Sequence, residues 1–196
     1  MSDLPEKRSI MKDFKAEAFS IPNLLSWFRL LLIPVFIVQY MNGEFLNALL
    51  TLAVSGLSDV LDGRIARKYN MVTDVGKVLD PIADKLTQCA MIFCVATRFP
   101  AMWILLIIHI TKELIMLAFG YYVLKKTDTV NSAKWYGKLC TGVMYAVMML
   151  HVVMPELSVE VSNGLIFLCA ALIIMSFVMY SLRYIEILKK QKEQTK

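Results

Sequence analysis

The sequence has few of the residues that build disulfides or histidine metal sites. It contains four cysteines and two histidines in 196 residues. The cysteines lie within apolar runs and form no C-x-x-C pair, so we expect packing residues rather than disulfides or zinc ligands. His109 and His151 have no partner at metal-ligand spacing, and we expect both to be structural. These absences argue against a disulfide-stabilised protein and against a histidine or cysteine metal centre.

Charged residues are also scarce. They make up 19% of the chain, whereas hydrophobic residues make up 58% and the mean hydropathy is +0.58. A soluble domain of this length would usually be less apolar. The apolar residues form blocks of about 20, the length that a helix needs to cross a bilayer. No charged start, short apolar core and small-residue cleavage site precede the first block, so we expect no cleaved signal peptide.

Six apolar spans predict an all-α integral membrane protein with six transmembrane helices. They run near 21–41, 45–66, 77–97, 101–124, 136–154 and 159–182. The short connections contain Gly, Pro, Asn or Asp, as turn chemistry predicts. The sequence therefore predicts a membrane domain over 21–186, a polar juxtamembrane segment at 1–20 and a basic tail at 187–196.

The segment at 1–20 is too polar to span a bilayer but has one apolar face. Ile10, Met11, Phe14 and Ala18 share this face, and the neighbouring lysines lie off it. The pattern favours an amphipathic helix on the inner membrane surface, with a disordered tail as the alternative.

Most of the net charge of +5 comes from lysines and arginines at the ends of the spans. Membrane topology accounts for this charge, so we expect contact with membrane lipids and no nucleic-acid partner. With a cytoplasmic N-terminus, the inner connections receive nearly all the cations and the outer ones only Arg98. The positive-inside rule therefore predicts a multi-pass protein of the inner or plasma membrane with both termini in the cytoplasm.

Four aspartates lie at the predicted inner ends of the second and third spans, where charge is costly. Asp59 and Asp62 are three residues apart, so they share a helix face. Asp80 and Asp84 are four apart and also share a face. Because the connection between the spans is short, the two faces are expected to converge near the cytoplasmic surface.

Carboxylates gathered this closely repel one another unless protons or cations neutralise them. Oxygen ligands suit magnesium or manganese, and a bridged metal pair is a common device for phosphate chemistry. Gly63 and Ala66 would let a bulky group approach the helix, and Arg67 suits phosphate oxygens. Gly76 opens the third span near this site, or simply marks a junction between loop and helix.

Together these residues resemble the signature of the CDP-alcohol phosphotransferase family, D-x-x-D-G-x-x-A-R followed by G-x-x-x-D-x-x-x-D. The matching positions are Asp59, Asp62, Gly63, Ala66, Arg67, Gly76, Asp80 and Asp84. The predicted spans, termini and chain length are also similar to those of the family. The resemblance implies an enzyme that transfers a phosphatidyl group from a CDP-linked donor, usually CDP-diacylglycerol, to an alcohol and releases CMP.

The resemblance also implies a role for each matching residue. Asp59, Asp62, Asp80 and Asp84 would hold a pair of Mg²⁺ or Mn²⁺ ions, and Asp84 would also be the general base towards the acceptor hydroxyl. The CDP group would contact Asp59, Asp62, Gly63, Ala66, Arg67 and Gly76. The family is usually dimeric, which implies a homodimer.

Other segments resemble the bacterial phosphatidylglycerophosphate synthases of this family. They are IPNLLSWFRLLLIPVF at 21–36, LDPIADK at 79–85 and GKLCT at 137–141. The resemblance favours glycerol 3-phosphate as the acceptor, and the candidate contacts to its phosphate are Arg29, Lys112, Lys134 and Lys138. Two interpretations without a ligand role stay open: Arg29 could offset the negative charge of the aspartates, and Lys112 could form a buried structural pair with Glu113.

The chain departs from those synthases in its fourth and fifth spans. Lys112-Glu113 replaces an Arg–Glu pair, Cys140 stands where a lysine is usual, and Trp135 and Tyr136 are unexpectedly aromatic. A cardiolipin synthase of the same family, with phosphatidylglycerol as acceptor, is therefore the nearest alternative. Inositol phosphate and serine acceptors are less favoured.

Two other classes of protein fit the aspartates poorly. A small cation transporter would place acidic residues near the membrane midplane, whereas all four aspartates lie at one end of the spans. No inverted repeat and no second acidic cluster continues an ion path. A structural membrane subunit does not explain the cluster at all.

Overall fold

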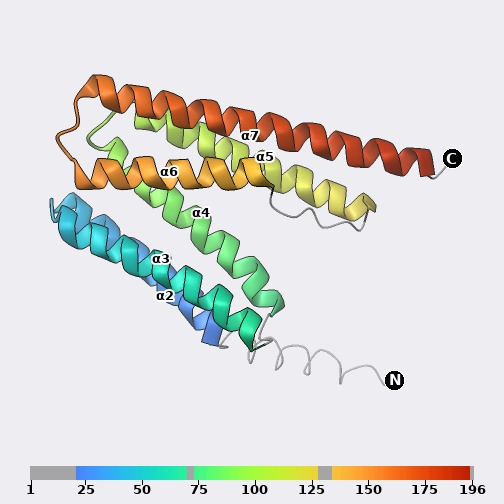
Figure 1. Cartoon of the computed structure of the whole chain (residues 1–196), viewed down its shortest axis with the longest axis horizontal. Coiled ribbons are helices and arrows are strands. Elements are labelled where there is room, and N and C mark those ends of the chain that lie inside the picture. The colour runs from blue at the N-terminus through green and yellow to red at the C-terminus, as the bar shows by residue number, and fades with distance from the viewer. Residues whose placement is uncertain (1–20, 70–72, 128–133, 195–196) are drawn as a thin grey trace, which may run out of the picture. The chain divides into compact units, whose positions relative to one another are not determined.

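The computed structural model describes residues 21–69, 73–127 and 134–194. All regular structure in these ranges is helical (Figure 1): α2 (Ile21–Met41), α3 (Phe45–Lys68), α4 (Asp74–Ala96), α5 (Met102–Thr127), α6 (Trp135–Val153) and α7 (Val159–Gln194). The predicted all-α class is confirmed. The surface helix predicted at 1–20 lies outside the described residues.

Among the described residues, five helices are long and apolar enough to cross a membrane. Their candidate spans are Asn23–Met41, Phe45–Ile65, Met102–Val123, Trp135–Val153 and Val159–Gln191. α4 has 23 residues, which is long enough for a bilayer, but Asp80, Asp84 and Lys85 interrupt its apolar run. α4, which is not among these five apolar helices, is thus one of the two helices that carry the aspartates.

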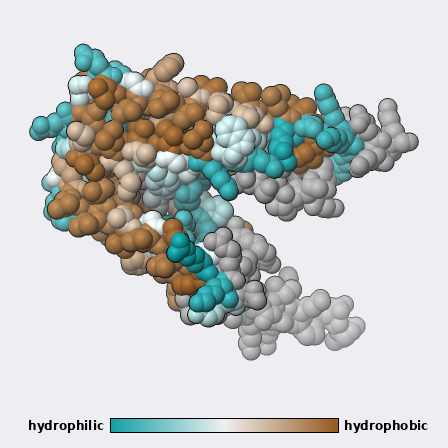
Figure 2. Space-filling model, viewed as in Figure 1, coloured by the Kyte–Doolittle hydropathy of each residue, from teal (hydrophilic) through white to brown (hydrophobic). Residues whose placement is uncertain are grey.

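The outer faces of the helices are strongly apolar, as expected of a surface in contact with lipid. Large hydrophobic side chains stay exposed along them, among them Leu31, Leu117 and Phe167. Figure 2 shows hydrophobic residues over much of the visible helix surface and hydrophilic ones near helix ends, among them the C-terminal ends of α3 and α7. An apolar surface of this extent would be an aggregation hazard in water, and here it supports the integral membrane class.

The helices extend beyond the predicted spans at several ends. α4 begins at Asp74, before the predicted span, because Thr73 caps it: the Gly76 backbone N–H donates to Thr73 Oγ1 at 3.0 Å. α7 has 36 residues and continues to Gln194, so most of the predicted basic tail is helical. The connections that the predicted spans leave at 67–76 and 125–135 are correspondingly even shorter.

The chain divides into two compact units, Met1–Met91 and Ile92–Lys196. In the first unit, α2 packs along α3 after a tight turn at Gly43, whose φ of 78° favours glycine. Phe36, Tyr40 and Leu52 lie buried between these two helices. The Thr51 hydroxyl donates to Gln39 Oε1 at 2.7 Å, so this polar pair is satisfied inside an apolar region.

Polar side chains attach the start of α4 to α2 in the same unit. The Asn23 amide donates to Thr73 Oγ1 at 2.9 Å. Gly76 lies against this pair so closely that an added Cβ would come within 2.5 Å of Asn23 Oδ1. The first turn of α4 is therefore fixed beside α2, and this contact sets the position of the aspartates that follow.

In the second unit, α7 packs against both α5 and α6. Buried His151 contacts the Val147 carbonyl oxygen through Nδ1 at 2.7 Å and Ser162 Oγ through Nε2 at 3.0 Å. Its ring also packs edge-on against Phe99, with centroids 5.0 Å apart. These contacts confirm the structural role expected of this histidine.

Candidate active site

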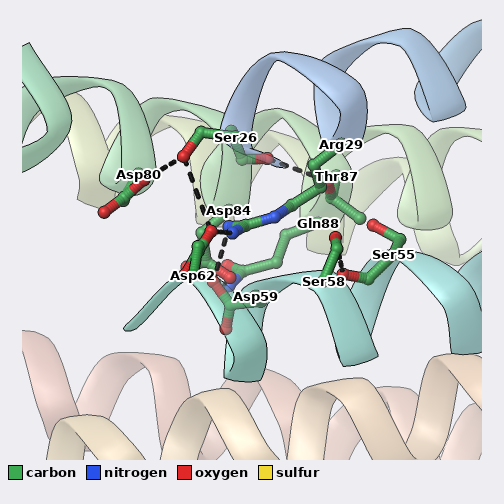
Figure 3. A network of polar contacts seen from close by, with 11 residues as sticks. Ser26, Arg29, Ser55, Ser58, Asp59, Asp62, Asp80, Asp84, Thr87 and Gln88 are labelled. Atoms are coloured by element: carbon green, nitrogen blue, oxygen red, sulfur yellow. Dashed lines mark hydrogen bonds and ion pairs between the residues drawn. The ribbon is translucent and has the colours of Figure 1, made fainter. Parts of the chain in front are cut away.

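Polar side chains from three helices of the first unit meet at one place (Figure 3). α2 contributes a row spaced by three residues, and α4 contributes a row spaced by four, so each row follows one helix face. Together with α3 they supply Ser26 and Arg29 from α2, Ser58, Asp59 and Asp62 from α3, and Asp80, Asp84 and Gln88 from α4. The predicted convergence of the two aspartate pairs is thus seen, with α2 as an additional partner.

Arg29 is the cation that holds the two aspartates of α3. Its Nη1 lies 2.6 Å from Asp59 Oδ1, and its Nη2 lies 2.5 Å from Asp62 Oδ2. The Arg29 and Asp62 side chains are 3% and 5% exposed, whereas that of Asp59 is 55% exposed. The guanidinium therefore bridges a buried carboxylate and an accessible one, as its fork geometry allows.

Ser26 connects the aspartates of α3 and α4. Its hydroxyl donates a short hydrogen bond to Asp80 Oδ1 and lies 3.5 Å from Asp62 Oδ2. Ser26 and Asp62 are both buried, and Asp80 is half-buried. A hydroxyl has one proton to donate, so Asp80 takes the stronger contact.

Asp84 is held from its own helix. The Gln88 amide nitrogen donates to Asp84 Oδ2 at 2.8 Å, one turn further along α4. Asp84 is half-buried, and Gln88 is fully buried. The contact therefore restrains the Asp84 carboxylate from a neighbouring turn of the same helix.

The cluster gathers four carboxylates around the Arg29 guanidinium, which pairs with two of them, and close carboxylates attract cations. Yet within the part of the chain described, no three His, Cys, Asp or Glu side chains are arranged to hold a metal ion. Asp59 and Asp62 are instead drawn to Arg29. The oxygen-only donor set suits a hard divalent cation by its chemistry, and its carboxylates would have to turn to enclose one.

The other signature residues lie around the ends of the same two helices. Gly63 follows Asp62 directly on α3 and is half-buried. Ala66 and Arg67 are on the last turn of α3, and their side chains fall outside the described part of the structure. Gly76 is buried against Asn23 and Thr73. Close packing against α2 therefore accounts for a glycine at this position, whether or not it contacts a substrate.

The predicted acceptor contacts are divided between the two units. Arg29 is engaged with Asp59 and Asp62, which matches its interpretation as a countercharge. In the second unit, Lys112 lies 2.5 Å from Glu113, the pair that the sequence suggested. Lys134 is the N-cap residue of α6, and its backbone N–H donates to the Tyr180 hydroxyl at 3.1 Å. Lys138 is exposed one turn later.

Sequence reasoning missed Ser26 and Gln88. Each is a polar residue inside an apolar helix, and each repeats the spacing of a residue already singled out. Ser26 is three residues before Arg29, and Gln88 is four after Asp84. Extending the two rows by one helical step would have found both.

Comparisons with known proteins agree with the signature. A family model described as CDP-alcohol phosphatidyltransferase matches residues 19–180, which include every site residue named above. A protein of Shigella flexneri serotype 5b (strain 8401) named CDP-diacylglycerol–glycerol-3-phosphate 3-phosphatidyltransferase is 31% identical over 170 residues, 83% of this chain and 93% of its own length. A protein of Escherichia coli (strain K12) with the same name is 30% identical over the same coverage. The chain belongs to the CDP-alcohol phosphatidyltransferase family.

Proposed function

We propose that this chain transfers the phosphatidyl group of CDP-diacylglycerol to the hydroxyl of glycerol 3-phosphate, giving phosphatidylglycerophosphate and CMP. The observation that carries the proposal is the meeting of signature aspartates from α3 and α4 at Ser26. The acceptor follows from the relatives, which are named for this reaction.

We further propose that a pair of Mg²⁺ or Mn²⁺ ions is held by Asp59, Asp62, Asp80 and Asp84. Their carboxylate oxygens suit these cations, and the gathering of four carboxylates at one place favours them. The metals would neutralise the pyrophosphate of the donor and stabilise the departing CMP. To take part, Asp59 and Asp62 would exchange their contacts with Arg29 for contacts with metal.

In the proposed reaction, the acceptor hydroxyl oxygen forms a bond to the phosphorus of the phosphatidyl group. The bond between that phosphorus and the CMP oxygen breaks, and CMP keeps its electron pair. Asp84 accepts the hydroxyl proton as general base. The CDP group would lie along the ends of α3 and α4, against Asp59, Asp62, Gly63, Ala66, Arg67 and Gly76.

The phosphate of the acceptor calls for a cation near the metal site. We propose Arg29 as the first candidate, because it would be released when Asp59 and Asp62 turn to the metals, and a guanidinium binds phosphate oxygens in two places at once. Lys112, Lys134 and Lys138 of the second unit remain the other candidates.

The same proposal extends to the membrane setting. The excess of cations in the predicted inner connections supports cytoplasmic termini and a cytoplasmic active site, in a bacterial inner membrane. A site at the ends of the helices would meet both the lipid chains of the donor and the water-soluble acceptor. Family membership supports a homodimer.

A product assay with purified protein tests the function. The protein in detergent is given Mg²⁺ or Mn²⁺ and CDP-diacylglycerol, and CMP and the lipid product are identified separately with glycerol 3-phosphate, phosphatidylglycerol, inositol phosphate and serine. We expect CMP and phosphatidylglycerophosphate with glycerol 3-phosphate, and neither in the presence of a metal chelator.

The acceptors also separate the alternatives. Cardiolipin formed from phosphatidylglycerol, without turnover of glycerol 3-phosphate, would replace the proposed acceptor with that of a cardiolipin synthase. Lys112 and Cys140, where this chain differs from the usual residues of phosphatidylglycerophosphate synthases, favour testing this second candidate. The absence of CMP with all four acceptors would overturn the enzymatic proposal and leave a cation transporter as the remaining alternative.

A further inference from the structure

Gln88 is a buried polar residue of α4 that lies outside the family signature. Its side chain is 1% exposed, and its amide nitrogen donates to Asp84 Oδ2 at 2.8 Å. Figure 3 shows the two side chains meeting beside the other aspartates. Because residues four apart share a helix face, α4 fixes this contact through its own backbone geometry.

The carbonyl oxygen of the Gln88 amide is unfavourable to bury. This Oε1 atom is buried and has no hydrogen-bond partner among the described residues. An unsatisfied buried acceptor destabilises a fold, so an apolar side chain of similar size would make this one more stable. Gln88 therefore does not serve stability. Its contact with the Asp84 carboxylate of the proposed active site gives a functional reason for a glutamine at this position.

We propose that Gln88 is the positioning residue of Asp84. The amide N–H holds Oδ2 and thereby fixes the rotation of the carboxylate, so that Oδ1 points to the acceptor hydroxyl. This inference rests on the proposed function, in which Asp84 takes the hydroxyl proton while the hydroxyl oxygen bonds to phosphorus and CMP leaves.

The physical reason is geometric. A general base works when its oxygen lies about 2.6–3.2 Å from the proton donor. Misplacement by about 1 Å can cost as much as 10²-fold in rate. A directed hydrogen bond to one oxygen limits the rotation of the carboxylate and so helps to keep that distance.

The test compares Gln88→Leu with Thr87→Val in steady-state CMP release, with both substrates varied in turn. Thr87 is the matched control, because it is also buried on α4 but its hydroxyl donates at 2.8 Å to the Ala83 carbonyl of its own helix. We expect kcat of Gln88→Leu to fall about tenfold, the equivalent of one hydrogen bond of about 1.4 kcal/mol, with KM unchanged for both substrates. Thr87→Val should keep kcat within about twofold of the wild type.

Two further measurements separate positioning from structural support. The unfolding temperature of Gln88→Leu in detergent should equal or exceed that of the wild type, since the unpaired oxygen is gone. Gln88→Asn, whose amide is one methylene too short to reach Oδ2, should lose as much kcat as Gln88→Leu. An unchanged kcat in Gln88→Leu, or a loss matched by Thr87→Val, would overturn the inference. A wild-type protein that releases no CMP would instead overturn the proposed function.

Discussion

The two units of the chain treat their polar side chains differently. In the second unit, the polar side chains described above pair with close neighbours: Lys112 with the adjacent Glu113, and His151 with its own helix and Ser162. In the first unit, side chains from α2, α3 and α4 share one network. Local pairs are the cheapest way to keep polar groups in a membrane, so a network drawn from three helices needs another reason.

That reason is the unequal charge. Lys112 and Glu113 form a pair of one cation and one carboxylate, whereas the Arg29 guanidinium is shared by two carboxylates of a four-aspartate cluster. A fold selected for stability alone would not gather like charges at one end of two helices. The comparison therefore supports the proposal that the active site lies in the first unit.

The largest difference between the two units is expected when one carboxylate is removed from each. Asp84→Asn keeps the shape of the side chain but cannot take a proton, so we expect CMP release to fall about 10²–10⁴-fold. The control is Glu186→Gln, because Glu186 is 62% exposed and pairs with Lys190 at 2.8 Å in the second unit. It should stay within about twofold of the wild type. Activity of Asp84→Asn above about a tenth of the wild type would remove Asp84 as the base.

Much of this site follows from the sequence because the signature uses helical spacing. Asp59 with Asp62, and Asp80 with Asp84, could be placed on shared faces from their numbers alone, and the all-α class followed from the long apolar runs. The partners across helices could not be derived in this way. That Arg29 meets α3, and that Asn23 lies on Gly76, depends on how the helices pack, and no local pattern determines packing.

Gln88 was missed for a different reason. An isolated glutamine in an apolar run resembles an incidental polar residue, and only the hydrogen bond to Asp84 gives it meaning. α4 was predicted as a span like the others, but the charges of its first half set it apart from the five apolar helices. Charge in a membrane helix is thus a better guide to function than to the number of spans.

The second prediction compares the two ion pairs. Arg29→Met would leave the buried Asp62 carboxylate without its guanidinium, and we expect a loss of about 3–5 kcal/mol in the free energy of unfolding. Lys112→Met should cost about 1 kcal/mol, because the Lys112 and Glu113 side chains are 15% and 18% exposed and keep access to other partners. Unfolding of both variants in detergent, without substrate, measures the difference.

Adding metal ions to the same two variants tests the comparison further. If Mn²⁺ shares oxygens with Arg29, its addition should raise the unfolding temperature of Arg29→Met by more than that of the wild type, because the guanidinium no longer competes. Lys112→Met should respond as the wild type does. Equal losses in the two variants, or no response of Arg29→Met to Mn²⁺, would contradict the proposal that Arg29 competes with metal ions for these aspartates.

The smallest expected effect concerns one glycine in each unit. An added Cβ at Gly76 would lie 2.5 Å from Asn23 Oδ1, whose amide is already bonded to Thr73 at 2.9 Å, whereas one at Gly142 would meet nothing within 4 Å. We expect Gly76→Ala to lower stability by about 1 kcal/mol through overpacking, and Gly142→Ala to raise it by about 0.5–1 kcal/mol through helix propensity. Thermal unfolding resolves the opposite signs, and a loss of CMP release in Gly76→Ala alone would show that the start of α4 has to lie against α2 for the aspartates to work. If both variants gained stability, the contact between Gly76 and Asn23 would not be what positions α4.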